Sequence, residues 1–148
     1  MNQLMTRVAV SADVDDIELL AHEAVDQEAA PARAVEVLQT FNRRVLDDEV
    51  HYRTTLRLYL DQWLAASADG DSSPVVREGR RTRWLGSALA PLRGTVPDDD
   101  LDRLVAALAL LTGIEAMSVL REVCQLSEDE ALAVTEWAAE TLIDATTR

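Results

Sequence analysis

Apolar positions recur along most of the chain every three to four residues, the spacing of one face of an α-helix. Residues that favour helix starts and stops divide this pattern into about six helices. The expected helices run from Asp13 to near Val25, from Pro31 onward, from Asp48 to Ser67, from Pro74 to Pro91–Gly94, from Pro97–Asp100 to about Val123, and from Ser127 to the C-terminus. We therefore predict an all-α fold in a single domain, residues 1–148.

Several of these helices carry a marked apolar stripe. The stripe after Pro31 consists of Ala34, Leu38, Phe41 and Val45. The next helix places Tyr52, Leu56, Tyr59, Leu60 and Trp63 on one face and Arg53, Arg57 and Asp61 on the other. The three charged residues on the second face are four positions apart, the spacing of ion pairs on a helix surface. The last helix opens with a capping box at Ser127 and Glu130 and carries a stripe of Ala131, Val134, Ala138, Leu142 and Ala145.

The fourth and fifth helices have unusual surfaces. Gly79, Thr82 and Gly86 form a row of small residues that would let another backbone approach closely. From Leu104 to Leu120 the only charged residue is Glu115. A helix that is apolar nearly all round must be covered on nearly all sides, and one small domain covers one face well. We therefore expect a second copy of the chain to cover the rest, with the last two helices of each copy forming a four-helix bundle.

Composition narrows the function. The 148 residues are 48% hydrophobic and carry a formal net charge of −13, and all 14 basic residues are arginine. Because a segment this acidic is repelled by phosphate backbones, we expect no direct contact with nucleic acid. The stretch from Leu104 to Leu120 is too short and too polar for a membrane span. Without a signal-like N-terminus, these features predict a cytoplasmic protein.

The second half of the chain resembles the C-terminal half of TetR/AcrR-type transcriptional regulators. The likeness extends from about Asn42 to Arg148 and includes the run VREGRRTRWLGSALAPLR. Its most specific pieces are Gly113-Ile-Glu-Ala116, Val119-Leu-Arg-Glu-Val123, and the segment from Leu126-Ser127 through Trp137-Ala-Ala139. This half is the variable part of the family, so these motifs are typical of a subgroup.

The resemblance implies a ligand-binding domain that forms a homodimer through its last two helices. A small, mostly apolar effector would bind between the middle helices and change the spacing of two N-terminal helix-turn-helix heads, releasing DNA. In the family pattern that head precedes residue 1, and residues 1–12 correspond to a remnant of the connecting helix. The alternative is a stand-alone helical protein that binds a ligand or caps a partner regulator without binding DNA.

Aromatic and polar residues side by side are typical of small-molecule pockets. The candidate ligand-binding residues are His51, Tyr52, Thr55, Tyr59, Trp63, Trp84 and Met117. The alternative is that the aromatic side chains form core and the polar row faces solvent.

The candidate dimer-interface residues are Leu108, Leu111, Ile114, Glu115, Val134, Ala138 and Leu142. A carboxylate on an apolar helix is costly unless it is paired. Glu115 could face a ligand, pair with Arg121 or Arg103 across the seam, or lie in a thin solvated strip. The basic run of Arg77, Arg80, Arg81 and Arg83 is expected to pair with carboxylates or to contact the head.

Other chemistry has little support in the sequence. Neither His22 nor His51 has Glu three places before it, as a di-iron bundle requires, and Cys124 is the single cysteine. There is no phosphate-binding loop and no nucleophile elbow. We expect no metal, no cofactor and no enzymatic activity.

Overall fold

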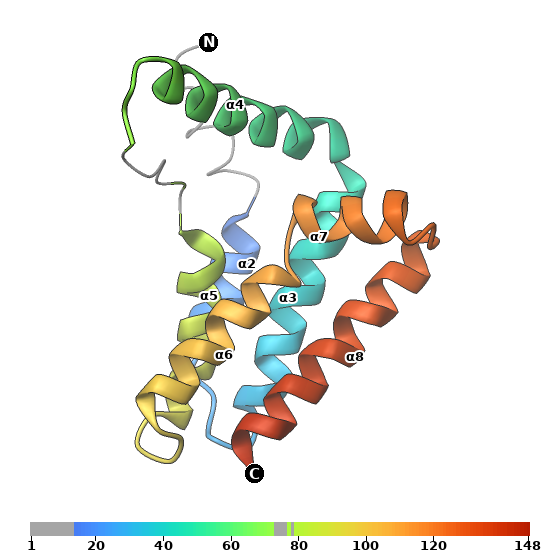
Figure 1. Cartoon of the computed structure of the whole chain (residues 1–148). Helices are drawn as coiled ribbons and strands as arrows, with labels where there is room; N and C mark the ends of the chain where they lie inside the picture. Colours follow the sequence, from blue (N-terminus) through green and yellow to red (C-terminus); the bar gives the residue numbers. More distant parts are fainter. Residues whose placement is uncertain (1–13, 73–76, 78) are drawn as a thin grey trace.

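The computed structural model describes residues 14–72, 77 and 79–148, and the regular structure within them is helical. In chain order the elements are α2 (Asp15–His22), α3 (Ala30–Asp47), α4 (Glu49–Ala68), α5 (Arg80–Leu89), the 3-10 turn η1 (Ala90–Leu92), α6 (Asp98–Leu110), α7 (Ile114–Ser118), the π-helical turn η2 (Val119–Val123) and α8 (Glu128–Thr147). The predicted all-α fold is confirmed (Figure 1). The expected segment 1–12 and the expected helix start at Pro74 lie outside the described residues.

Helix α3 is the centre of the core. It packs against α2, α5 and α8, and in Figure 1 it runs between α5 and α8. The predicted stripe is confirmed, because Ala34, Leu38, Phe41 and Val45 are all buried. Pro31 lies in the first turn of α3, where its missing N–H costs no helical hydrogen bond.

The predicted capping box at the start of α8 is also confirmed. The Ser127 hydroxyl accepts from the Glu130 amide at 3.1 Å, and the Ser127 amide donates to the Glu130 carboxylate at 2.7 Å. These bonds satisfy two backbone groups that would otherwise lack a partner at the helix start. The start of α8 is therefore fixed by its own sequence.

Helix α4 crosses one end of the molecule and packs mainly against α3 and α7 (Figure 1). Its predicted apolar stripe is buried only near its N-terminal end, at Tyr52. Leu60 and Trp63 are on the same face but are 56% and 55% exposed. The stripe is correct in register, but α4 extends past the helices that could cover it.

The prediction of one continuous helix from Pro97–Asp100 to Val123 is wrong. The helix breaks at residues 111–113, and the segments on either side are bent by 52°. Gly113 adopts a φ of +100°, which other residues rarely adopt, so the backbone leaves the helical path there. No single described helix has the length and apolarity to cross a membrane, although α6 and Ile114–Val123 pass that test together as a bent pair.

The core face of α8 also differs from the expected stripe. The buried residues are Ala131, Thr135, Ala139 and Ile143. Thr135 is fully buried because its hydroxyl donates to the Gln39 side chain of α3 at 3.0 Å. The core face is therefore rotated about the helix axis from the predicted one, and Val134 and Leu142 are left 37% exposed.

Two smaller expectations need correction. Helix α2 ends at His22, before the predicted end near Val25. Gly79 precedes α5 as its N-cap, and the position of a Cβ on Gly86 has no atom within 4 Å. The row of small residues therefore does not receive a closely packed backbone in the described part of the chain.

Candidate functional site

Three aromatic rings from α3, α4 and α5 meet in the core. The Phe41 ring contacts the Tyr52 ring with centroids 5.6 Å apart and the Trp84 ring at 5.2 Å, both edge to face. This geometry suits the ring quadrupoles and adds about 0.5–1.5 kcal/mol per pair beyond burial. We call Phe41, Tyr52 and Trp84 the aromatic cluster.

The polar edge of Trp84 is anchored to α2. Its indole N–H donates to the Glu18 carboxylate, which also pairs with Arg83 at 2.9 Å. The hydrogen bond from Trp84 and the charge of Arg83 hold the pKa of Glu18 below its usual value, although burial acts in the opposite direction. This anchor fixes the position of Trp84 without a ligand.

The structure brings four of the predicted ligand-binding residues together. His51 contacts the Tyr52 ring edge-on at 5.1 Å, and Tyr52 joins Trp84 through Phe41. Thr55 lies one turn beyond His51 and donates its hydroxyl to the His51 carbonyl at 3.0 Å. Buried rings edged by a few polar groups match the composition of a small-molecule site.

The remaining predicted ligand-binding residues differ widely in exposure. The Tyr59 ring lies 4.9 Å from the Arg77 guanidinium that covers it. Trp63 is 55% exposed, whereas Met117 is 1% exposed, as is Trp84. A ligand could contact Met117 or Trp84 only if the surrounding helices separated.

The break between α6 and α7 is held by a side chain from α3. Asn42, which is fully buried, donates to the Leu111 carbonyl at 2.9 Å and accepts from the Gly113 amide at 2.8 Å. These bonds replace helical backbone bonds that the break removes, and buried backbone groups need such partners. Asn42 therefore fixes where the helix stops.

Two arginines converge on the first turn of α7. Arg81 donates to the Thr112 carbonyl at 2.6 Å and to the Glu115 carboxylate at 3.0 Å, and Arg77 pairs with the same carboxylate at 2.5 Å. We call Arg77, Arg81 and Glu115 the arginine–glutamate node. Its side chains are 26–37% exposed, so its charges are partly shielded from solvent.

The node settles how Glu115 is paired within the chain. Of the expected partners, Arg121 instead donates to the Leu126 carbonyl, and Arg103 pairs with Asp100. The partners within the chain come from the basic run before and within α5. The expectation that this run pairs with carboxylates is confirmed for Arg77, Arg81 and Arg83.

The node predicts a loss of stability in acid. Burial raises the pKa of Glu115, but the charges of Arg81 and Arg77 outweigh it and place the pKa below the usual 4.5. A lowered folded-state pKa stabilises the protein above the unfolded pKa, and this contribution disappears as pH falls through the folded value. Glu115→Gln should therefore cost about 1 kcal/mol at pH 7, after solvent screening is allowed for, and less at pH 3.

Urea denaturation of wild type and variant at the two pH values measures this difference. Glu140→Gln, at an exposed position of α8, is the control and should leave stability the same at both pH values. An equal cost of Glu115→Gln at pH 7 and pH 3 would show that the carboxylate charge is not what stabilises the node.

Asn42 and Phe41 are site residues that the sequence interpretation did not single out. Asn42 is four residues after Leu38 and three before Val45, so it falls on the apolar face of its helix. An amide at such a position is almost always hydrogen-bonded, and that signal could have found it. Phe41 was assigned to the core stripe, which is correct, but its link between Tyr52 and Trp84 depends on how three helices pack.

The predicted interface residues divide into two groups. Leu108 is 0% exposed and Ile114 5%, so their side chains are enclosed within one chain and offer no surface to a second copy. Glu115 pairs with Arg77 and Arg81 in the arginine–glutamate node. Val134 and Leu142 are exposed, whereas Leu111 and Ala138 are half-buried. Exposed apolar side chains outside the predicted set include Trp137 at 68%, Leu110 at 79% and Val123 at 75%.

Other surface features give no further chemistry. A groove of about 520 Å³ between α3 and α8 is lined by Pro31, Ala32, Val35, Glu36, Gln39, Arg43, Glu136, Glu140, Ile143 and Asp144. A second, of about 360 Å³, lies between the start of α4 and the end of η2. Among the described residues, no three His, Cys, Asp or Glu side chains are grouped so as to hold a metal ion.

Comparison with known proteins adds nothing to this geometry. No protein-family model, no curated protein and no solved structure matches the chain.

Proposed function

We propose that this chain is the effector-binding and dimerisation domain of a TetR-type transcriptional regulator. The observation that carries the proposal is an uncovered apolar strip on α8, formed by Val134, Trp137 and Leu142. The resemblance in the second half of the chain assigns dimerisation to this helix and the one before it.

The strip has the chemistry of an interface between two copies. Its three members lie beside the small residues Ala138, Thr141 and Ala145, which permit close helix contact. Exposed apolar side chains grouped on one face of a helix are typical of binding surfaces. In a two-fold dimer the same strip serves both subunits, so α8 would pack against its own copy.

The aromatic cluster supports the sensing part of the proposal. It joins α3, α4 and α5, the middle helices between which the resemblance places the effector. A small apolar molecule that bound between these rings would separate the helices and shift the population toward a different arrangement of α4. In such a regulator the DNA-reading heads follow that arrangement, while the acidic domain itself stays off the DNA.

The mass of the chain in solution tests the proposal directly. Light scattering coupled to size exclusion should give a dimer of twice 16.3 kDa. Val134→Glu should weaken dimerisation by about 100-fold or more, because it places a charge in the centre of an apolar seam. Leu108 is not suitable for this test, because a charge at a fully buried position would unfold the chain.

Leu64→Glu is the matched control. Leu64, like Val134, is an exposed apolar residue on a helix, with 59% of its surface accessible, but it lies on α4 and outside the strip. It should leave the dimer unchanged. A wild-type monomer at all concentrations would overturn the regulator proposal and favour the stand-alone binding protein.

A further inference from the structure

Helix α4 is attached to the rest of the molecule unlike any other long helix in the described part of the chain. Of its 20 residues only Tyr52 is buried, whereas α3, with 18 residues, buries eight. Leu56, Leu58 and Tyr59 are half-buried, and Leu56 packs against the core, but Val50, Leu60, Trp63 and Leu64 are 55–78% exposed. Burial of apolar area therefore contributes less to holding α4 in place than to holding α3.

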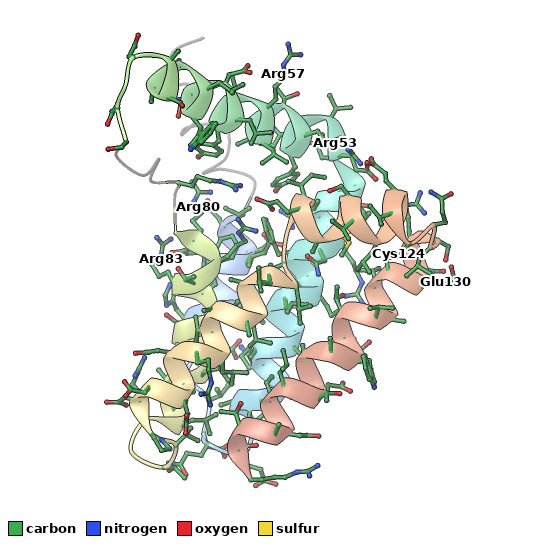
Figure 2. The ribbon with its side chains drawn as sticks, viewed as in Figure 1. Arg53, Arg57, Arg80, Arg83, Cys124 and Glu130 are labelled. Atoms are coloured by element: carbon green, nitrogen blue, oxygen red, sulfur yellow. The ribbon has the colours of Figure 1, made fainter. Side chains whose placement is uncertain are left out.

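Charged contacts add to this small apolar interface. Near the start of α4, Arg53 pairs with Glu122 of η2 at 2.5 Å (Figure 2). One turn before it, Glu49 accepts from the same guanidinium at 3.2 Å. The Arg53 side chain is 42% exposed, so dissolved ions reach this bridge.

A second bridge holds the middle of α4. The Tyr59 ring lies under the Arg77 guanidinium at 4.9 Å, and Arg77 pairs with Glu115 of α7 at 2.5 Å. A cation over an aromatic face is an electrostatic contact like the ion pair beside it. Both bridges end on the segment Ile114–Val123, beyond the break in the fifth predicted helix.

The position of α4 determines whether the aromatic cluster is enclosed. Tyr52 covers one edge of Phe41, which in turn contacts Trp84. At its N-terminal end α4 joins α3 through the single non-helical residue Asp48, with φ −137° and ψ 55°. Rotation of the backbone at this residue would lift α4 away from Phe41 and leave α3 intact.

We infer that α4 is a cover over the aromatic cluster that is held closed by these two charged bridges, so that ionic strength sets how often it opens. Salt shortens the Debye length from about 30 Å at 0.01 M to about 3 Å at 1 M. Exposed ion pairs weaken under such screening, whereas apolar contacts do not. The cover should therefore open more often at high salt while the core of α3, α5, α6 and α8 keeps its stability. This inference does not depend on the proposed function, because it needs neither an effector nor a dimer.

Amide hydrogen exchange of the full-length chain, read by mass spectrometry, tests the inference. Raising NaCl from 0.02 M to 1 M should speed exchange in peptides from residues 49–68 by about three- to ten-fold, because a detached α4 is only marginally helical in water and its amides then exchange. Exchange in peptides from α3 and α8 should stay the same. Unchanged exchange in α4 would overturn the inference, and so would equal acceleration in all helices.

Arg53→Gln and Arg57→Gln form a matched pair for the same measurement. Both remove one positive charge from α4, but among the described residues Arg57 pairs with Asp61 of its own helix alone, at 3.8 Å, and 83% of its side chain is exposed (Figure 2). Arg53→Gln at low salt should speed α4 exchange by about three-fold and reduce its salt response, and Arg57→Gln should do neither. Glu122→Gln should match Arg53→Gln, and the double variant should add nothing. Equal behaviour of the two arginine variants, or additive effects of Arg53→Gln and Glu122→Gln, would show that the Arg53–Glu122 bridge does not hold the cover.

Discussion

Asn42→Ala should lower the free energy of unfolding by about 3 kcal/mol. The amide is fully buried and bonds both sides of the break between α6 and α7, to the Leu111 carbonyl and the Gly113 amide. Alanine would leave both backbone groups buried without these partners, at a cost of about 1–3 kcal/mol for each unsatisfied group. Urea denaturation followed by circular dichroism measures the loss.

Arg43→Ala is the control for this substitution. Arg43 is the next residue on the same helix, and its side chain is exposed, so removing it should change stability by less than about 0.5 kcal/mol. A cost below 1 kcal/mol for Asn42→Ala would mean that water or a local shift satisfies the break, and that α3 does not set its position.

Gly113→Ala should destabilise the protein by about 2–4 kcal/mol. Gly113 has φ +100° and ψ −170°, a region that costs other residues about 1–3 kcal/mol. A Cβ there would also lie 2.9 Å from Nη1 of Arg81 and 3.3 Å from the Glu115 carboxylate. The added methyl group must therefore push apart the arginine–glutamate node. Thermal and urea unfolding should both register the loss.

Gly86→Ala provides the opposite expectation within the same protein. Gly86 lies inside α5 with ordinary helical geometry, and its Cβ position is free of neighbours within 4 Å. Alanine should stabilise this helix by about 0.5–1 kcal/mol because it restricts the unfolded chain. If Gly113→Ala and Gly86→Ala both stabilised the protein, the positive φ at residue 113 would not be needed to form the break.

The break between α6 and α7 connects these substitutions to the proposed function. It turns Ile114–Val123 away from the line of α6, and both charged bridges to α4 end on this segment. The same segment leads directly into α8, which carries the exposed apolar strip. A weakened break is therefore expected to disturb both the cover over the aromatic cluster and the proposed dimer surface.

Features that depend on residues close together in the chain were predictable without the structure. The stripe of α3, its start at Pro31, the bounds of α4 to within one residue and the capping box of α8 all follow from local spacing and local hydrogen bonds. These features need no knowledge of neighbouring helices, because a helix start is satisfied by its own next turn and an apolar stripe records only which side avoids water.

Tertiary structure decided where the fifth predicted helix breaks, which face of α8 is buried and how far α4 is covered. The break depends on Asn42 and Arg81, which are 71 and 31 residues away in sequence from the backbone groups they bond. Thr135 is polar, yet it lies on the core face of α8 because Gln39 of α3 satisfies its hydroxyl. In each case the spacing of apolar residues along the sequence is compatible with burial of more than one helix face. The choice among them depends on which distant side chain supplies a hydrogen bond or covers an apolar group, and only the packed chain brings those partners together.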